Sequence, residues 1–448
     1  MNGEPSRGIL RRAAGNAGML LGGKSASGAM QLATFALAAR GLGVTEFGNF
    51  SVVVAQVMLL TGLASFDSNQ AIIRYGVLHL NSGDSAGFQA LVKAGTLLDV
   101  GAATLAAVVT IVVAPLLGAR LGWGPDLVLL SQLAAPLAFA NAISTPKGML
   151  RLFGRFDLLS SHSVVTPAVR LAFVTGLWAT GATLGWYIAV WLVAGWVGAA
   201  VAFWFAWREA RRRELLGGMN SSLRGLAEAN HGVWHFSILS NLNSSVAMIP
   251  THLSVLLVAS LLGPAAAGIF RIAREFGTGM IKPVDLVAQA LYPDMARLVA
   301  ARNWRRLKRA AVGAGLAAAA TGVAVTLLVL IAGDALVNAI FGRDFVPAVP
   351  ILIAMALATS IRMLAFAADP VMYALGRPSV PLAVSTASAG LFVSIMVWRL
   401  PIDGLAGAGW AFLAMGVLGC LLSAVAASRM VGNERRRDQA AQQDPPTG

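Results

Sequence analysis

The segment PAAAGIFRIAREFGTGMIKPVDLVAQALY, residues 264–292, is long enough to cross a membrane, yet it carries five charged side chains. At about 100° per residue, its polar positions fall within roughly 100° of one another around a helix. They are Arg271, Arg274, Glu275, Thr278, Lys282, Asp285 and Gln289. Charges at bilayer depth are costly and usually face a bundle interior or a watery cavity, where they mark a pathway. The pattern therefore predicts a membrane path for a charged, anionic substrate.

The whole chain has the composition of an integral membrane protein. It is 57% hydrophobic and 12% charged over 448 residues, with a mean hydropathy of +0.71, whereas a soluble domain is roughly 25% charged. Twelve apolar stretches approach the ~20 residues needed to cross hydrocarbon. They span about residues 16–39, 47–67, 94–117, 127–145, 164–183, 186–206, 234–260, 265–290, 310–332, 347–373, 379–398 and 404–428. We therefore expect an all-α polytopic membrane protein with twelve transmembrane helices.

The basic residues are distributed as in a membrane protein whose two termini are cytoplasmic. The net charge of +14 would by itself suggest nucleic-acid binding. With both termini inside, however, 24 of the 34 Lys and Arg residues fall in inner segments, 4 in outer loops or helix ends, and 6 within helices. The positive-inside rule accounts for this asymmetry, so we expect no nucleic-acid partner. The basic segments 211–213 and 297–309 should lie at the inner surface, where they could also attract anionic membrane lipids.

The first apolar run imitates a secretory signal peptide, because Arg11-Arg12 precedes it and Ala36-Leu37-Ala38 lies near its end. It is too long for a signal peptide and Lys24 interrupts it, so we expect it to remain as the first membrane span. Cys420 is the sole cysteine. Neither a disulfide framework nor a thiolate metal site is therefore expected.

Two short motifs recur in the second half of the chain, at nearly the same separation from their first copies. Positions 42–50 (LGVTEFGNF) and 262–270 (LGPAAAGIF) share the pattern L-G-x4-G-x-F. Phe153-Gly154-Arg155 is echoed by Leu375-Gly376-Arg377. In the first motif, one glycine frees the backbone to end a helix and the second small residue admits the next helix. With six spans in each half, the halves are parallel repeats, and the substrate path in such folds lies between them near the midplane.

The expected organisation has four parts. Residues 1–207 form a six-helix lobe, 208–232 a cytoplasmic linker and 233–430 a second six-helix lobe. The tail, 431–448, is charged and then rich in Gln, Asp and Pro, so we expect it to be disordered.

Candidate substrate-binding residues come from the polar faces of the first, seventh, eighth and tenth expected helices. Nothing about packing requires a cation in mid-membrane. Guanidinium groups bind phosphate bidentately, and lysine acts as a point charge. The substrate-binding residues predicted for an electropositive chamber are Lys24, Gln31, Asn241, Arg271, Arg274 and Arg362. The residues assigned to coupling or gating are Asp99, Glu275, Lys282 and Asp285.

Local neutralisation is the alternative role for these charges. Arg271 can pair with Glu275 at i,i+4, and the last two charges of the segment can pair at i,i+3. Arg362 has Asp369 two turns further on, or it can pair with another helix. Asp99 can simply stay hydrated near the inner interface.

The stretch at 37–50, LAARGLGVTEFGNF, is followed by Phe66-Asp67 and Ile72-Ile73-Arg74-Tyr75. It resembles the opening of the polysaccharide-biosynthesis flippases, the Wzx-type members of the multidrug/oligosaccharidyl-lipid/polysaccharide exporter superfamily. The motif at 262–270 and the turn at Gly376-Arg377 resemble the same pattern.

This resemblance implies two lobes that move undecaprenyl-diphosphate-linked oligosaccharides from the inner to the outer leaflet of the bacterial inner membrane, for lipopolysaccharide, O-antigen or exopolysaccharide synthesis. It implies a cationic central cavity with contributions from the first and eighth helices, here Lys24 and Arg271 or Arg274. It also implies coupling to an ion gradient or to the membrane potential. It further implies a monomer, with a glycan polymerase and a chain-length regulator as candidate partners.

Other classes fit the sequence less well. A multidrug antiporter of the same superfamily should prefer acidic cavity residues, and lipid II flippases typically have two further helices. A major-facilitator transporter should carry a Gly/Asp/Arg-rich signature between Asp67 and Lys93, and a glycan polymerase or ligase a longer outer loop than 333–346. The chain has no Gly-rich phosphate loop, H-E-x-x-H motif or nucleophile elbow, so we expect neither enzymatic activity nor a cofactor.

Overall fold

The computed structural model describes residues 4–65, 68–215, 217, 245–246, 248–277, 295, 297–299, 301–375, 377 and 379–443. This part of the chain is α-helical and contains no strand. It divides into two compact units, Met1–Ser260 and Leu261–Gly448. The fold class expected from the sequence, an all-α polytopic membrane protein, is confirmed.

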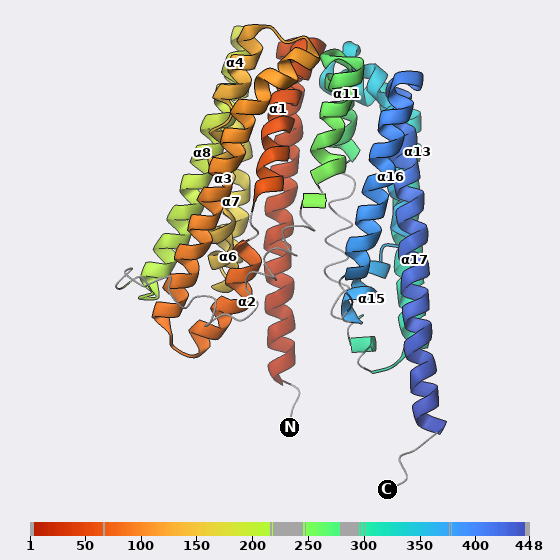
Figure 1. The fold of residues 1–448 in the computed structure, drawn as a ribbon. Helices are drawn as coiled ribbons and strands as arrows, with labels where there is room; N and C mark the ends of the chain where they lie inside the picture. The colour runs from red at the N-terminus through yellow and green to blue at the C-terminus, as the bar shows by residue number, and fades with distance from the viewer. Residues whose placement is uncertain are drawn as a thin grey trace. The chain divides into compact units, whose positions relative to one another are not determined.

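The first unit consists of helices that pack along one another (Figure 1). They are α1 (Glu4–Ala64), α2 (Ser68–Asn81), α3 (Ser85–Leu121), α4 (Pro125–Leu133), α5 (Leu137–Ala140), α6 (Ser144–Leu152), α7 (Phe156–Thr180), α8 (Leu184–Arg212), the π-helix η1 (Ile249–Leu253) and α11 (Ser254–Leu262), whose end belongs to the second unit. Helix α1 packs along α7, and α7 packs along α8.

The second unit begins at residue 261, and residues 264–277 are helical. Its further elements are α13 (Trp304–Phe341), the 3₁₀-helix η2 (Arg343–Ala348), α14 (Val349–Leu364), α15 (Ala368–Ala374), α16 (Ser379–Asp403) and α17 (Leu405–Gln443). Helix α14 packs against both α13 and α17, and α16 packs along α17 (Figure 1).

Nine helical segments of the described residues are long and apolar enough to cross a membrane. The first of them, Gly22–Asn81, contains two of the expected spans. Expected spans seven and eight, residues 234–260 and 265–290, each lie only in part within the described residues. The count of twelve therefore stays a prediction, as do the lobe boundaries at 207 and 233. Residues 431–443 were expected to be disordered but continue α17 as helix.

The first glycine in each copy of the L-G-x4-G-x-F motif does what the sequence predicts. Gly43 has φ 72° and ψ 175° and breaks α1 into two helices. Gly263 has φ 89° and separates α11 from the helix at 264–277. Positive φ is costly for any residue with a Cβ atom. The same backbone requirement thus recurs at the same position of both copies of the motif.

Two cytoplasmic-side turns of the predicted topology also repeat. Before α3, the side chain of Asp84 accepts a hydrogen bond from Gly87 N at 2.8 Å. Before α13, the side chain of Asn303 accepts one from Arg306 N at 3.2 Å. Both are N-caps that satisfy a free helix-end donor. In each case the residue just before the cap has positive φ, 70° in the first turn and 51° in the second. Asp84 and Asn303 are therefore equivalent positions of the repeat.

The second sequence echo is likewise visible in the backbone. Arg155 N donates to Leu150 O at 2.9 Å, and Arg377 N donates to Met372 O at 3.1 Å. These hydrogen bonds span the same number of peptide units and close the turns after α6 and α15. Gly154, in the first of the two turns, has φ 69°. The internal repeat predicted from short motifs is therefore present as repeated turn geometry.

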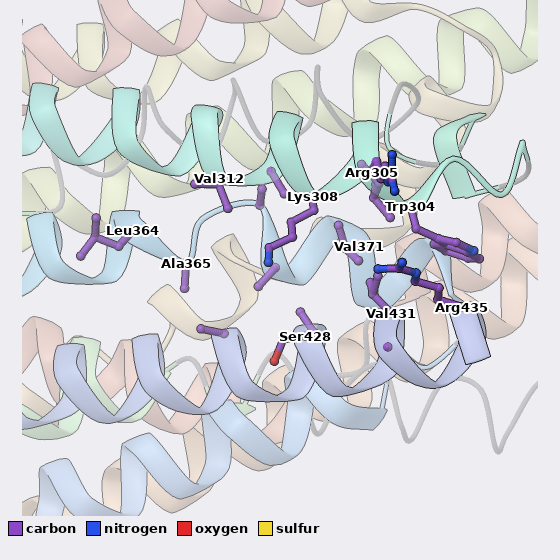
Figure 2. Close-up of a pocket in the computed structure, with 17 residues that line it drawn as sticks. Trp304, Arg305, Lys308, Val312, Leu364, Ala365, Val371, Ser428, Val431 and Arg435 are labelled. Atoms are coloured by element: carbon purple, nitrogen blue, oxygen red, sulfur yellow. The ribbon is translucent and has the colours of Figure 1, made fainter. Parts of the chain in front are cut away.

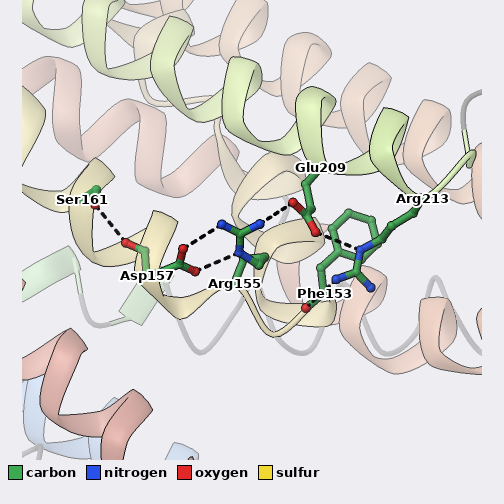
Figure 3. Close-up of polar contacts among 6 residues, drawn as sticks. All are labelled: Phe153, Arg155, Asp157, Ser161, Glu209 and Arg213. Atoms are coloured by element: carbon green, nitrogen blue, oxygen red, sulfur yellow. Dashed lines mark hydrogen bonds and ion pairs between the residues drawn. The ribbon is translucent and has the colours of Figure 1, made fainter.

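A network of ion pairs fixes the turn between α6 and α7 to the end of α8 (Figure 3). Arg155 Nη1 lies 2.5 Å from Glu209 Oε2, and its Nη2 lies 2.7 Å from Asp157 Oδ2. Arg213 Nε lies 3.1 Å from Glu209 Oε1, and its Nη2 donates to Phe153 O at 3.1 Å. The hydrogen bonds to Asp157 are the main cause that raises the pKa of Arg155. The sequence explained Arg155 and Arg213 only as topology determinants. In the structure they also hold the ends of α6, α7 and α8 together.

Because Gly263 needs positive φ, Gly263→Ala should lower the free energy of unfolding by roughly 1–2 kcal/mol. Gly390→Ala is the matched control, since an added Cβ would meet open space at both sites and only Gly263 has positive φ. Alanine at 390, in the middle of α16, should be neutral or stabilise by up to about 1 kcal/mol. Melting temperatures in detergent test this difference, and a Gly263→Ala protein as stable as Gly390→Ala would contradict it.

Candidate buried cationic cluster

The helix at 264–277 places three charged side chains together inside the second unit. Arg271 Nη2 lies 2.7 Å from Glu275 Oε1, and Arg274 Nη2 lies 3.5 Å from the same oxygen. Arg271 and Arg274 are only 4% and 3% exposed. The i,i+4 pairing of Arg271 with Glu275 agrees with the sequence, which offered no partner for Arg274. We call Arg271, Arg274 and Glu275 the buried cationic cluster.

The apolar residues of this helix are buried as well. Phe270, Ile272 and Ala273 are 0% exposed, so this turn is covered on its apolar side too. The sequence predicted a wet cavity around the charged face, but both guanidinium groups are covered in this conformation. Burying two cations with one carboxylate is costly, because desolvation opposes the Coulombic attraction. Such an arrangement is rarely retained inside a membrane without a functional role.

The residues assigned to the first helix lie on α1. Lys24 is exposed and Gln31 is half-buried. Thr34, about one turn beyond Gln31, donates to the backbone oxygen of Met30 at 2.7 Å. Thr34 therefore has the local packing role that is common for threonine in membrane helices. Lys24 keeps its role as a predicted cation of the path.

Three of the predicted site residues cannot be placed. Asn241, Lys282 and Asp285 lie outside the described residues. Their assigned roles in substrate binding and coupling stay predictions.

Arg362 and Asp369 form the intra-span pair that was one alternative for Arg362. Arg362 Nη2 lies 3.7 Å from Asp369 Oδ2, across the break between α14 and α15. Ser423 Oγ on α17 donates to Asp369 Oδ1 at 3.4 Å. Gly419 of α17 lies directly against the Arg362 guanidinium, where a Cβ atom would collide with Nη1. Both charged side chains keep more than a third of their area exposed.

Asp99 is not hydrated, as one sequence alternative had it, but buried in the first unit at 4% exposure. Ser68 Oγ donates to its Oδ1 at 2.7 Å, and the backbone nitrogen of Thr145 donates to its Oδ2 at 2.8 Å. The carboxylate thereby joins α3 to the first residues of α2 and α6, where helix N-termini favour negative charge. This anchoring accounts for its burial, and its coupling role stays a prediction.

Two polar contacts of the first unit were not predicted. Ser131 Oγ donates to Gln56 Oε1 at 2.9 Å, and Gln56 Nε2 donates to Thr110 O at 3.2 Å, all in the buried core. The guanidinium of Arg170 stacks 4.3 Å from the centre of the Trp191 ring. A neutral polar residue such as Gln56 within an apolar stretch does not show in the sequence which residue it contacts. A cation–π contact likewise depends on the fold, which brings the two side chains together. Across the described ranges, no three His, Cys, Asp or Glu side chains come together as metal ligands.

The fold is that of known membrane transporters. A multidrug resistance MATE-family transporter of the MOP superfamily, in its inward-facing conformation, superposes with a TM-score of 0.75 at 14% identity, covering 93% of this chain and 96% of that chain. The lipid II flippase MurJ, in an inward closed conformation, superposes with a TM-score of 0.70 at 12% identity, covering 91% of this chain and 87% of that chain. The protein is therefore a multi-pass membrane protein with the exporter-superfamily fold expected from its sequence.

The sequence itself identifies the family. The family model described as polysaccharide biosynthesis protein matches residues 13–299. The inner membrane protein YghQ of Escherichia coli K12 is 30% identical over 329 residues, which cover 71% of this chain and 89% of that protein. The chain belongs to the polysaccharide biosynthesis protein family, which confirms the resemblance read from residues 37–75.

Removing the shared carboxylate should test how much the buried cationic cluster contributes to stability. Glu275→Gln leaves two buried guanidinium groups beside a neutral amide, and losing one partner of a buried pair costs about 3–5 kcal/mol. Asp403→Asn is the control, because Arg399 and Asp403 form an i,i+4 pair at 2.8 Å with side chains 25–32% exposed. That loss should stay near or below about 1 kcal/mol. Melting temperatures in detergent measure both losses. Equal shifts for Glu275→Gln and Asp403→Asn would show that burial does not make the Arg271–Glu275 pair contribute more to stability than the more exposed pair.

Proposed function

We propose that the protein flips undecaprenyl-diphosphate-linked oligosaccharides from the inner to the outer leaflet of the bacterial inner membrane, and that the buried cationic cluster binds the diphosphate. Membership of the polysaccharide biosynthesis protein family supports this substrate class. The fold shared with a lipid II flippase supports the type of movement. The observation that carries the proposal is the pair of arginines buried at 3–4% exposure next to the carboxylate of Glu275.

The chemistry of the cluster suits a diphosphate. Arg271 and Arg274 offer planar donor forks that match phosphate oxygens, and each hydrogen bond would join opposite charges. With Glu275 the cluster holds two cations and one anion. An arriving diphosphate would accept hydrogen bonds from both guanidinium groups, which Glu275 would hold in place before it arrives. The low dielectric of a buried site strengthens each of these interactions.

Access to the cluster requires another conformation, because both guanidinium groups are covered here. In alternating access, one lobe moves against the other around a site near the midplane. Lys24 and Gln31, with Asn241 and Arg362, are proposed to line the path. Glu275, Lys282, Asp285 and Asp99 are proposed to couple the movement to an ion gradient or to the membrane potential. The charge distribution supports cytoplasmic termini, so the substrate would enter from the inner leaflet.

Reconstituted protein should accelerate transbilayer movement of a diphospholipid-linked oligosaccharide in liposomes. Arg271→Ala and Arg274→Ala should each reduce this rate by at least tenfold, since a charge-assisted hydrogen bond is worth about 1.5–3 kcal/mol. Arg399→Ala is the control, because it removes an arginine from another i,i+4 pair of the same unit.

The rates are compared at equal amounts of folded protein, measured by melting temperature. Normal rates for both variants would show that Arg271 and Arg274 do not take part in transport. A wild-type protein that gives no acceleration over protein-free vesicles would reject transport of that glycan lipid.

Export of organic cations is the second candidate, because a MATE-family transporter shares the fold with a TM-score of 0.75. A cation would be repelled by a cluster with two arginines, so this function should not use it. Efflux of a fluorescent organic cation from the same vesicles, unchanged by Arg274→Ala, would favour the second candidate over the first.

A further inference from the structure

A cavity of about 360 Å³ lies in the second unit, away from the buried cationic cluster (Figure 2). It is lined by the first turns of α13, by residues 364–371 at the junction of α14 and α15, and by the C-terminal part of α17. Most of its wall is alanine, valine and leucine. Its polar lining consists of Trp304, Arg305, Lys308, Ser428 and Arg435.

The internal repeat shows that the first unit fills the equivalent space. When the N-cap turns before α3 and α13 are aligned, Phe88 corresponds to Leu307 and Gln89 to Lys308. Phe88 is 1% exposed and belongs to a tightly packed core cluster. Gln89 Nε2 donates to Leu215 O at 2.8 Å and so closes that region with a hydrogen bond. In the second unit, by contrast, Lys308 extends into the space between α13 and α17 (Figure 2).

The turn after α15 repeats this difference. When it is aligned with the turn after α6, Met149 corresponds to Val371 and Phe153 to Leu375. In the first unit the rings of Phe88 and Phe153 pack with centroids 6.0 Å apart. Both aromatic side chains are replaced by leucine in the second unit, and Met149 by the smaller valine. Two of these smaller residues, Leu307 and Val371, line the cavity, so smaller side chains in a repeated turn contribute to its space.

The cavity is amphipathic along its length. Its lining on α13 runs from Trp304 to Val312, which is about 12 Å of helix. Trp304, Arg305 and Arg435 lie toward one end and Val312 and Leu364 toward the other (Figure 2). Tryptophan and cations mark the membrane interface, and apolar residues lie at hydrocarbon depth. The cavity is therefore polar at one end and apolar at the other, as a phospholipid is from its headgroup to its acyl chain.

An ion pair fixes the polar end of this cavity. Arg302 Nη1 lies 2.7 Å from Asp438 Oδ1, and Trp304 Nε1 donates to Asp438 Oδ2 at 2.8 Å. These contacts hold the end of α17 against the start of α13. Asp438 is thus engaged by Arg302 and Trp304 at the edge of the cavity. The cations of the lining, Arg305, Lys308 and Arg435, are exposed.

We propose that this cavity binds one anionic phospholipid of the inner leaflet. Its phosphate lies among Arg305, Lys308 and Arg435, and part of one acyl chain enters the apolar end beside Val312 and Leu364. An apolar cavity of roughly 150 Å³ already stays dry and takes up benzene, so 360 Å³ is ample for a chain segment. Clustered cations at the inner surface attract anionic headgroups and discriminate against zwitterionic ones. This site is separate from the transported lipid and does not depend on the proposed function.

Native mass spectrometry of the full chain in detergent, titrated with phosphatidylglycerol or phosphatidylcholine, tests the site. The wild-type protein should retain one phosphatidylglycerol in preference to phosphatidylcholine. The triple variant Arg305→Gln/Lys308→Gln/Arg435→Gln should weaken phosphatidylglycerol binding by roughly a hundredfold, from the usual contribution of each surface cation. Ala424→Phe, which narrows the cavity without changing charge, should weaken it by at least tenfold.

The matched control is Arg306→Gln/Arg309→Gln/Arg436→Gln, which removes three exposed cations next to the same positions but outside the lining. It should change binding less than about threefold, since surface potential alone acts on both variants alike. Equal loss in the two triple variants would overturn the proposal in favour of general electrostatic attraction. Preference for undecaprenyl diphosphate over phosphatidylglycerol at this site would also overturn it, and unchanged binding in Ala424→Phe would exclude the acyl-chain part.

Discussion

Two guanidinium groups buried inside an apolar helical unit, next to a partly buried carboxylate, place the strongest constraint on this protein. Ions lose most of their hydration there, so they must hold one another in place or be neutralised by a ligand. Arg271 and Arg274 share Glu275, and the apolar residues on either side of them are fully covered. The helix at 264–277 therefore cannot be turned toward lipid without exposing its cations. A diphosphate is the ligand chemistry that this arrangement suits best.

The two units share the same backbone turns, but different side chains pack around these turns in each unit. Glycine with positive φ, N-caps and turn hydrogen bonds recur at equivalent positions of the two halves. In the first unit, aromatic rings and an ion-pair network close the region around α6 and α8. In the second unit, smaller residues leave an amphipathic cavity at the equivalent place. Duplication of a helical unit followed by divergence of side chains accounts for both observations.

The sequence predicts the features that rest on local chemistry. The helical fold, the breaks at Gly43 and Gly263, the pairing of Arg271 with Glu275 and the family all follow from composition, motif and spacing. It does not predict the covering of both arginines, because burial depends on which helices pack around them. Nor does it predict that Asp99 anchors two helix starts or that residues 431–443 stay helical. Those outcomes depend on long-range packing, which a single sequence does not show.

The central claim is that Arg271 and Arg274 meet the diphosphate of the transported lipid. Its most direct test is photo-cross-linking with a lipid-linked oligosaccharide that carries a reactive group next to the diphosphate, followed by mapping of the adducts by mass spectrometry. The account predicts adducts within residues 264–277 that disappear when excess unlabelled lipid is added. Competed adducts found only at other segments, such as the lining of the α13–α17 cavity, would contradict it.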